Sequence, residues 1–200
     1  MVLFAHGSGS SRFSTRKRFV AGELNECGLG TLLLDLLTIG EEHRDAVDAH
    51  LRFDVELLAS RLCAVTAWLR MQPATEQPPI GYFGASTGAA AAFIAAAALP
   101  KEVGAIVSRG GRPDLARHAL PHVQAPTLLI VGGEDWTVLD LTRQAAQLLR
   151  CEQRLEVVEG ATHLFEETGA LEEVAELAGS WSAHHLSPNI TGARMQGSAR

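Results

Sequence analysis

The chain has 200 residues, of which 46% are hydrophobic, and its formal net charge is −6. This size and apolar content fit one domain with a well-buried core and are too small for two full enzyme domains. The mildly acidic balance argues against a nucleic-acid-binding surface, and no stretch approaches the ~20 apolar residues of a membrane span.

Six short apolar runs alternate with helical patterns along the chain. The runs are nearly continuous in apolar residues, which is typical of parallel strands buried on both faces. Helical spacing of apolar residues between the runs then favours a doubly wound α/β fold. We expect one domain over residues 1–186 and a frayed tail over 187–200. The expected strands are residues 2–5, 31–37, 80–83, 103–107, 127–131 and 155–158, and helices are expected around 58–69, 89–98, 138–148 and 171–181.

The third strand leads through Gly84-Ala85-Ser86-Thr87-Gly88 directly into an alanine-rich helix. A serine on a sharp strand-to-helix turn occupies a strained conformation, and glycines two residues away on each side relieve clashes there. The helix N-terminus also favours developing negative charge. Ser86 is therefore the candidate nucleophile; the alternative is a glycine-rich turn with an inert serine.

A serine nucleophile needs a base and a carboxylate that orients the base. Asp135 follows the strand at 127–131, and His163 lies in the loop after the last strand. Both loops lie at the carboxyl edge of a parallel sheet, where open α/β folds build their sites. In enzymes with a serine on such a strand-to-helix turn, the nucleophile comes first in the chain, the acid second and the histidine third. Ser86, Asp135 and His163 follow this order. Glu134 is the rival for the acid, and the histidines other than His163 and His6 are interpreted as surface residues.

The strand at 2–5 runs into a loop of small residues that begins at His6. Its backbone can approach a substrate closely, so Gly7 or Ser8 is expected to supply one oxyanion-hole N–H, with Thr87 supplying the other. His6 is expected to brace this loop rather than to react. The basic run Arg16-Lys17-Arg18 is interpreted as a solvent-exposed helix face.

Two arginines, Arg109 and Arg112, follow the strand at 103–107 on the same edge. A guanidinium there can bind a substrate carboxylate. The alternative is an ion pair with Asp114 or Asp35 that shapes the loop. Arg12, Arg16 and Asp35 are expected to form a similar brace near the loop after His6, and the other reading of these residues is again substrate binding. The segment from Ser108 to Pro126 leaves room for only a short helix, so no cap domain is expected.

Together these segments resemble the dienelactone-hydrolase-like family of small α/β hydrolases. The resemblance covers nearly all of residues 2–185. It implies the α/β-hydrolase fold, the Ser86, Asp135 and His163 triad, and neither a metal nor an organic cofactor. The chain departs from the family in having serine where dienelactone hydrolases proper use cysteine, and Lys17 where relatives carry asparagine. The matching segments are residues 6–12, 81–88, 108–114, 132–135 and 160–166.

We expect hydrolysis of a small carboxylic ester or lactone through an acyl-Ser86 intermediate. The alternatives are a non-catalytic binding or regulatory protein of this fold, and an acyltransferase or perhydrolase that uses the same triad. Three widely spaced cysteines argue against a zinc site or a disulfide framework and fit a reducing cytoplasm.

The sheet is expected to lack the strand pair with which such hydrolases usually begin. The strand at 31–37 would then be a long apolar edge, which favours self-association into a two-fold dimer.

Overall fold

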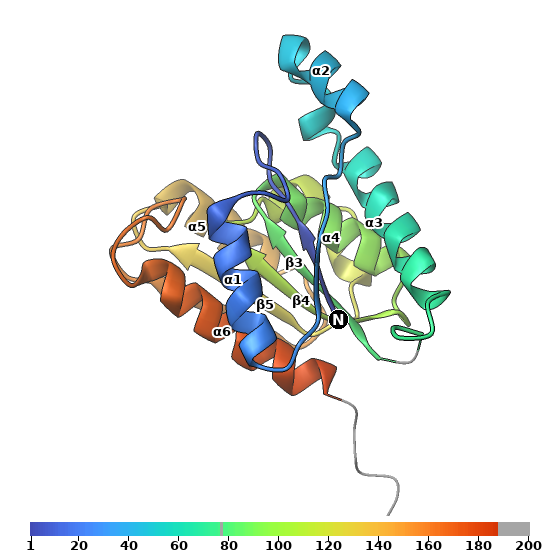
Figure 1. The fold of residues 1–200 in the computed structure, drawn as a ribbon. Helices are drawn as coiled ribbons and strands as arrows, with labels where there is room; N and C mark the ends of the chain where they lie inside the picture. Colours follow the sequence, from blue (N-terminus) through green and yellow to red (C-terminus); the bar gives the residue numbers. More distant parts are fainter. Residues whose placement is uncertain (77, 188–200) are drawn as a thin grey trace, which may run out of the picture.

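The computed structural model describes residues 1–76 and 78–187 and contains a six-stranded sheet in the order β2-β1-β3-β4-β5-β6 (Figure 1). All neighbouring strands are parallel, as the unbroken apolar runs predicted. The strands are β1 (Val2–Ala5), β2 (Thr31–Leu33), β3 (Ile80–Ala85), β4 (Val103–Arg109), β5 (Thr127–Gly132) and β6 (Gln153–Val158).

Helices cover both faces of this sheet. On one face α1 packs beside α6, and on the other α3 packs against α4 (Figure 1). Each face has its own core: Phe4 stacks on Phe83 under α1 and α6, whereas Leu3 and Tyr82 lie under α3 and α4. The helices are α1 (Thr15–Glu26), α2 (Ile39–Asp48), α3 (Val55–Arg70), α4 (Thr87–Ala98), α5 (Trp136–Ala146) and α6 (Ala170–Leu186), with short 3-10 turns η1 (Leu51–Phe53), η2 (Pro113–Ala116) and η3 (Leu120–His122).

Successive residues of β3 therefore point into different cores, which is why the strand reads as apolar throughout. The polar exception is the Tyr82 hydroxyl, which lies 2.6 Å from the Thr66 hydroxyl in the buried layer below α3. This hydrogen bond compensates for removing two hydroxyl groups from water.

The expected strand at 31–37 is too long. β2 ends at Leu33, because the chain beyond it leaves the sheet and bonds the loop after β1: the Leu36 N–H donates to His6, and Asp35 accepts from Arg12. β2 is one of the two edge strands of the sheet, as expected, and β6 is the other. Its three residues offer fewer groups for pairing than the sequence suggested, and dimerisation through it stays a prediction.

Between β4 and β5 the chain forms only the 3-10 turns η2 and η3, so the absence of a cap there is confirmed. Nearly all of the expected tail, residues 188–200, lies outside the described residues. None of the described helices combines the length and apolarity that crossing a membrane requires.

Candidate active site

Ser86 occupies the turn between β3 and α4, with φ 50° and ψ −123°. A positive φ is strained for a residue with a side chain, and such strain persists only where the surroundings hold it. Here the backbone of the turn after β4 does so. The Ser86 N–H donates to the Arg109 carbonyl at 3.4 Å, and the Ser86 carbonyl accepts from the Arg112 N–H at 3.1 Å.

The two glycines of the motif are required by close backbone contacts. A Cβ at Gly84 would lie 2.5 Å from the Ala89 Cα, and one at Gly88 would lie 2.2 Å from the Ala5 carbonyl oxygen. Both distances are far below van der Waals contact. The tight turn therefore fits only with glycine at these two positions.

Asp135 and His163 come together at the carboxyl ends of β5 and β6. His163 Nδ1 lies 2.6 Å from Asp135 Oδ2, and the carboxylate side chain is only 14% exposed. The two loops are also joined through their backbones, where the Glu134 N–H donates to the Ala161 carbonyl at 3.0 Å. The carboxylate fixes the ring so that Nε2 faces away from it.

The other candidates for the acid and for the base lie outside this Asp135–His163 pair. Glu134 is exposed to solvent, and the imidazole Nδ1 is bonded to Asp135 instead. Five of the six histidines interpreted as surface residues are exposed, and His185 is half-buried in α6. Asp135 is thus the carboxylate that orients His163.

Ser86 and His163 both line one cavity of about 390 Å³, which we call the Ser86 cavity. No hydrogen bond joins their side chains within the described part of the chain; such contacts are often loose in enzymes without substrate. The described residues also contain no cluster of three or more histidine, cysteine or acidic side chains suited to a metal ion. The Ser86 cavity is lined by Gly7, Ser8, Gly9, Ser10, Ser14, Arg16, Lys17, Ala85, Ser86, Arg109, His163 and Leu164.

The loop after β1 lies directly against Ser86, since a Cβ at Gly7 would be 2.8 Å from the Ser86 Cβ. The Ser8 N–H donates to the Thr87 hydroxyl at 3.1 Å. Thr87 begins α4, so its own N–H has no partner within the helix. The three residues expected to form an oxyanion hole are therefore neighbours of Ser86.

His6 braces this loop through both ring nitrogens. Nε2 accepts from the Leu36 N–H at 2.8 Å, so Nδ1 carries the proton and donates to the Gly7 carbonyl at 3.0 Å. Burial lowers the pKa of His6, and the carbonyl bond opposes this shift. The ring is consequently neutral and structural.

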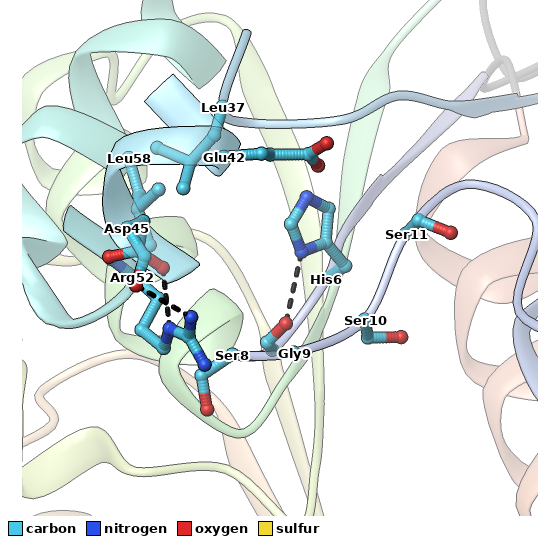
Figure 2. A pocket seen from close by; sticks show the side chains of 11 residues that line it. His6, Ser8, Gly9, Ser10, Ser11, Leu37, Glu42, Asp45, Arg52 and Leu58 are labelled. Carbon is cyan, nitrogen blue, oxygen red and sulfur yellow. Dashed lines mark hydrogen bonds and ion pairs between the residues drawn. The ribbon is translucent and has the colours of Figure 1, made fainter. Parts of the chain in front are cut away.

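A second cavity, of about 260 Å³, lies between the same loop and residues of α2, η1 and α3 (Figure 2). We call it the loop cavity. Two of its charged residues neutralise each other, because Asp45 accepts from the Arg52 side chain at 2.5 Å and from the Arg52 N–H at 2.9 Å. Its lining residues are His6–Ser11, Leu37, Glu42, Asp45, Arg52 and Leu58.

The two arginines considered for substrate binding have different surroundings. Arg112 is paired with Asp114 through two hydrogen bonds of 2.8 Å and does not line the Ser86 cavity. Arg109 lines it, donates to the Leu164 carbonyl at 3.3 Å and lies over the Phe165 ring. Burial, with the nearby charge of Arg16, lowers the pKa of Arg109 to about 10, which leaves it charged at neutral pH.

The sequence interpretation of Lys17 as a solvent-exposed residue is wrong. The run Arg16-Lys17-Arg18 was expected to be a solvated face, but the Lys17 residue is only 5% exposed and lines the Ser86 cavity. Its Nζ has no hydrogen-bond partner among the described residues. Arg16 bonds Glu166 instead of joining Arg12 and Asp35. The helical period places the middle residue of the run inward, which composition alone does not reveal.

Burial lowers the pKa of Lys17 to about 8, and Asp35 partly opposes this shift. The folded protein therefore binds the proton more weakly than the unfolded chain does, and the charged lysine costs stability below pH ~8. We expect Lys17→Met to stabilise the protein by about 1–3 kcal/mol at pH 7. Chemical denaturation at several pH values measures this. The gain should shrink between pH ~8 and ~10.5; a gain independent of pH would show that the ammonium is not the cause.

Comparison with known proteins identifies the family and the fold of the chain. The model of the dienelactone hydrolase family matches residues 37–184. A dienelactone hydrolase from Anabaena variabilis of known structure is 58% identical, with a TM-score of 0.91 over 92% of this chain and 86% of that one. The protein Est1E from Butyrivibrio proteoclasticus has a TM-score of 0.77 at 15% identity, over 94% of this chain and 88% of that one, which shows the fold alone.

These matches define an α/β-hydrolase fold. The chain belongs to the dienelactone hydrolase family. Curated relatives from two strains of Mycobacterium tuberculosis, each named "Putative phosphoribosyl transferase", are 58% identical over 186 residues. The match covers 93% of this chain and 41% of those proteins, so this chain spans less than half the length of these relatives.

Proposed function

We propose that this protein is a serine hydrolase that cleaves a small carboxylic ester or lactone. In this mechanism Ser86 Oγ attacks the substrate carbonyl carbon while its proton passes to His163 Nε2. Asp135 holds the imidazole in the required tautomer and stabilises the imidazolium. The N–H groups of Thr87 and of Gly7 or Ser8 stabilise the oxyanion.

The tetrahedral intermediate then collapses. The carbon–oxygen bond to the alcohol breaks, and His163 returns its proton to the departing oxygen. Water next attacks the acyl-Ser86 ester, with His163 accepting the water proton and later returning it to Ser86. The products are the alcohol and the carboxylic acid, and the Ser86 hydroxyl is regenerated.

One observation carries the proposal: Ser86, strained at its turn, shares a cavity with His163, and a ring nitrogen of His163 is bonded to the half-buried carboxylate of Asp135. A non-catalytic protein would gain nothing from maintaining this strain. The family of the chain supports hydrolysis as well. The match covers only 41% of the length of the curated relatives. Their name therefore does not assign an activity to this chain.

An acyltransferase or perhydrolase would form the same acyl-serine and differ only in the group that accepts the acyl chain. No cap between β4 and β5 shields the Ser86 cavity from water, which favours hydrolysis. Product analysis with and without an added alcohol or peroxide distinguishes these outcomes.

Covalent labelling by a fluorophosphonate tests the proposal. We expect rapid labelling of the protein on Ser86, identified by mass spectrometry, and no labelling of Ser86→Ala. The control is Ser60→Ala on the exposed side of α3, which should label like the parent protein. Absence of labelling in the folded parent would instead support the non-catalytic alternative.

A further inference from the structure

The Ser86 cavity contains two cations that the protein does not neutralise. Within residues 1–76 and 78–187, the other buried or half-buried lysines and arginines each have a carboxylate partner at 2.5–2.8 Å. Only Lys17 and Arg109 do not, and both line this cavity. Gln77 and residues 188–200 include no aspartate or glutamate side chain. The exception to the pairing rule is thus confined to the candidate active site.

The N-terminus of α1 adds to this positive charge. Helix N-termini carry partial positive charge and are stabilised by acidic residues, yet the first turn of α1 contains no acid and includes Arg16 and Lys17. Ser14, which precedes the helix, lines the cavity and makes no side-chain capping bond. A folding role would favour the opposite charges here, so the arrangement points to a bound anion.

We propose that Lys17 and Arg109, together with the N-terminus of α1, form a subsite for a dianionic group such as a phosphate monoester on the substrate of Ser86. That the anion belongs to a substrate of Ser86 rests on the proposed hydrolase function. Two cations that lack partners are neutralised by two negative charges. A single carboxylate would leave one of these two cations without a compensating charge.

The cavity has room for this group beside the reacting ester, since its volume is about 390 Å³. Arg109 has a fixed position because it also bonds the Leu164 carbonyl next to His163. Lys17 lies on the α1 side of the cavity, and its ammonium can donate up to three hydrogen bonds. Binding of the anion would thereby supply the partner that Lys17 lacks in the protein.

The test measures binding without turnover. Phenyl phosphate, benzoate and benzyl alcohol are titrated calorimetrically into the Ser86→Ala protein. We expect phenyl phosphate to bind at least tenfold more tightly than benzoate, and benzyl alcohol to bind most weakly. Lys17→Gln and Arg109→Gln should each weaken phenyl phosphate binding roughly tenfold or more, whereas Lys101→Gln, which removes an equivalent charge from an exposed site, should leave it unchanged.

The pH dependence of phenyl phosphate affinity distinguishes a Lys17 that binds the anion from a Lys17 that only supports the fold. The charged or titratable groups around Lys17 are Asp35, Arg16, Arg109, His6 and His163. Affinity should rise as the phosphate becomes dianionic near pH ~6 and fall above pH ~8 as Lys17 loses its proton. Lys17→Arg should abolish the alkaline fall, because a guanidinium stays charged there.

Equal binding of benzoate and phenyl phosphate would overturn the dianion assignment, and unchanged binding in Lys17→Gln would overturn the subsite. Failure of the proposed hydrolase function has a different signature. The parent protein would then bind phenyl phosphate in this way but would not react with the fluorophosphonate.

Discussion

Replacing Asp135 with Asn is expected to lower kcat for a small aryl ester by about 10³–10⁴-fold, with the fold intact. The amide keeps the shape of the side chain. It offers an N–H to the ring nitrogen that must itself donate, so it favours the wrong imidazole tautomer and no longer stabilises the imidazolium. Because the effect is on proton transfer, KM should change far less than kcat.

Glu134→Gln is the matched control, since the neighbouring carboxylate is exposed and does not bond His163. Steady-state kinetics of both variants, with circular dichroism to verify folding, measures the effect. If Glu134→Gln lost as much activity as Asp135→Asn, the assignment of the acid would be wrong.

Replacing Gly88 with Ala is expected to destabilise the protein by about 3 kcal/mol or more and to abolish labelling of Ser86. The added methyl group would lie 2.2 Å from the Ala5 carbonyl oxygen and 2.5 Å from the His6 carbonyl oxygen. Both are backbone atoms of the strand and loop that face Ser86. Relief of these contacts therefore requires α4 to move away from β1, which displaces Ser86.

Gly22→Ala provides the control within the same protein. Gly22 lies inside α1, and a Cβ there would meet nothing within 4 Å. Alanine should stabilise this helix by about 0.5–1 kcal/mol. Thermal unfolding of both variants measures the contrast. A Gly88→Ala protein as stable and as reactive as the parent would show that the turn is looser than its geometry indicates.

Much of the fold followed from local patterns. The six apolar runs predicted six strands because both faces of a parallel sheet are covered, and their alternation with helical periods predicted the layers. The turn at Ser86 was predictable because only glycine fits at positions 84 and 88. The positions of Asp135 and His163 followed from the rule that loops at the carboxyl ends of parallel strands converge. Their 2.6 Å contact agrees with that rule, and their catalytic roles stay predictions.

Other features depended on contacts between distant segments. β2 ends early because His6 takes the Leu36 N–H, a contact across 30 residues that no local pattern contains. Arg109 and Arg112 look equivalent in the sequence, but Asp114 neutralises Arg112 whereas Arg109 lines the cavity.

Local patterns were therefore enough to predict the order of the elements, the turn that carries Ser86 and the edge of the sheet where the candidate site lies, because sterics and hydrophobic periodicity act between neighbouring residues. Which charges lack a partner became clear only from the packing of distant segments. A run of three basic residues reads as a solvated face, yet the packing of α1 buries Lys17 beside Ser86 with no carboxylate to bond. Whether a charge is neutralised depends on segments that meet only in the folded chain, and this decides which anions the site can bind.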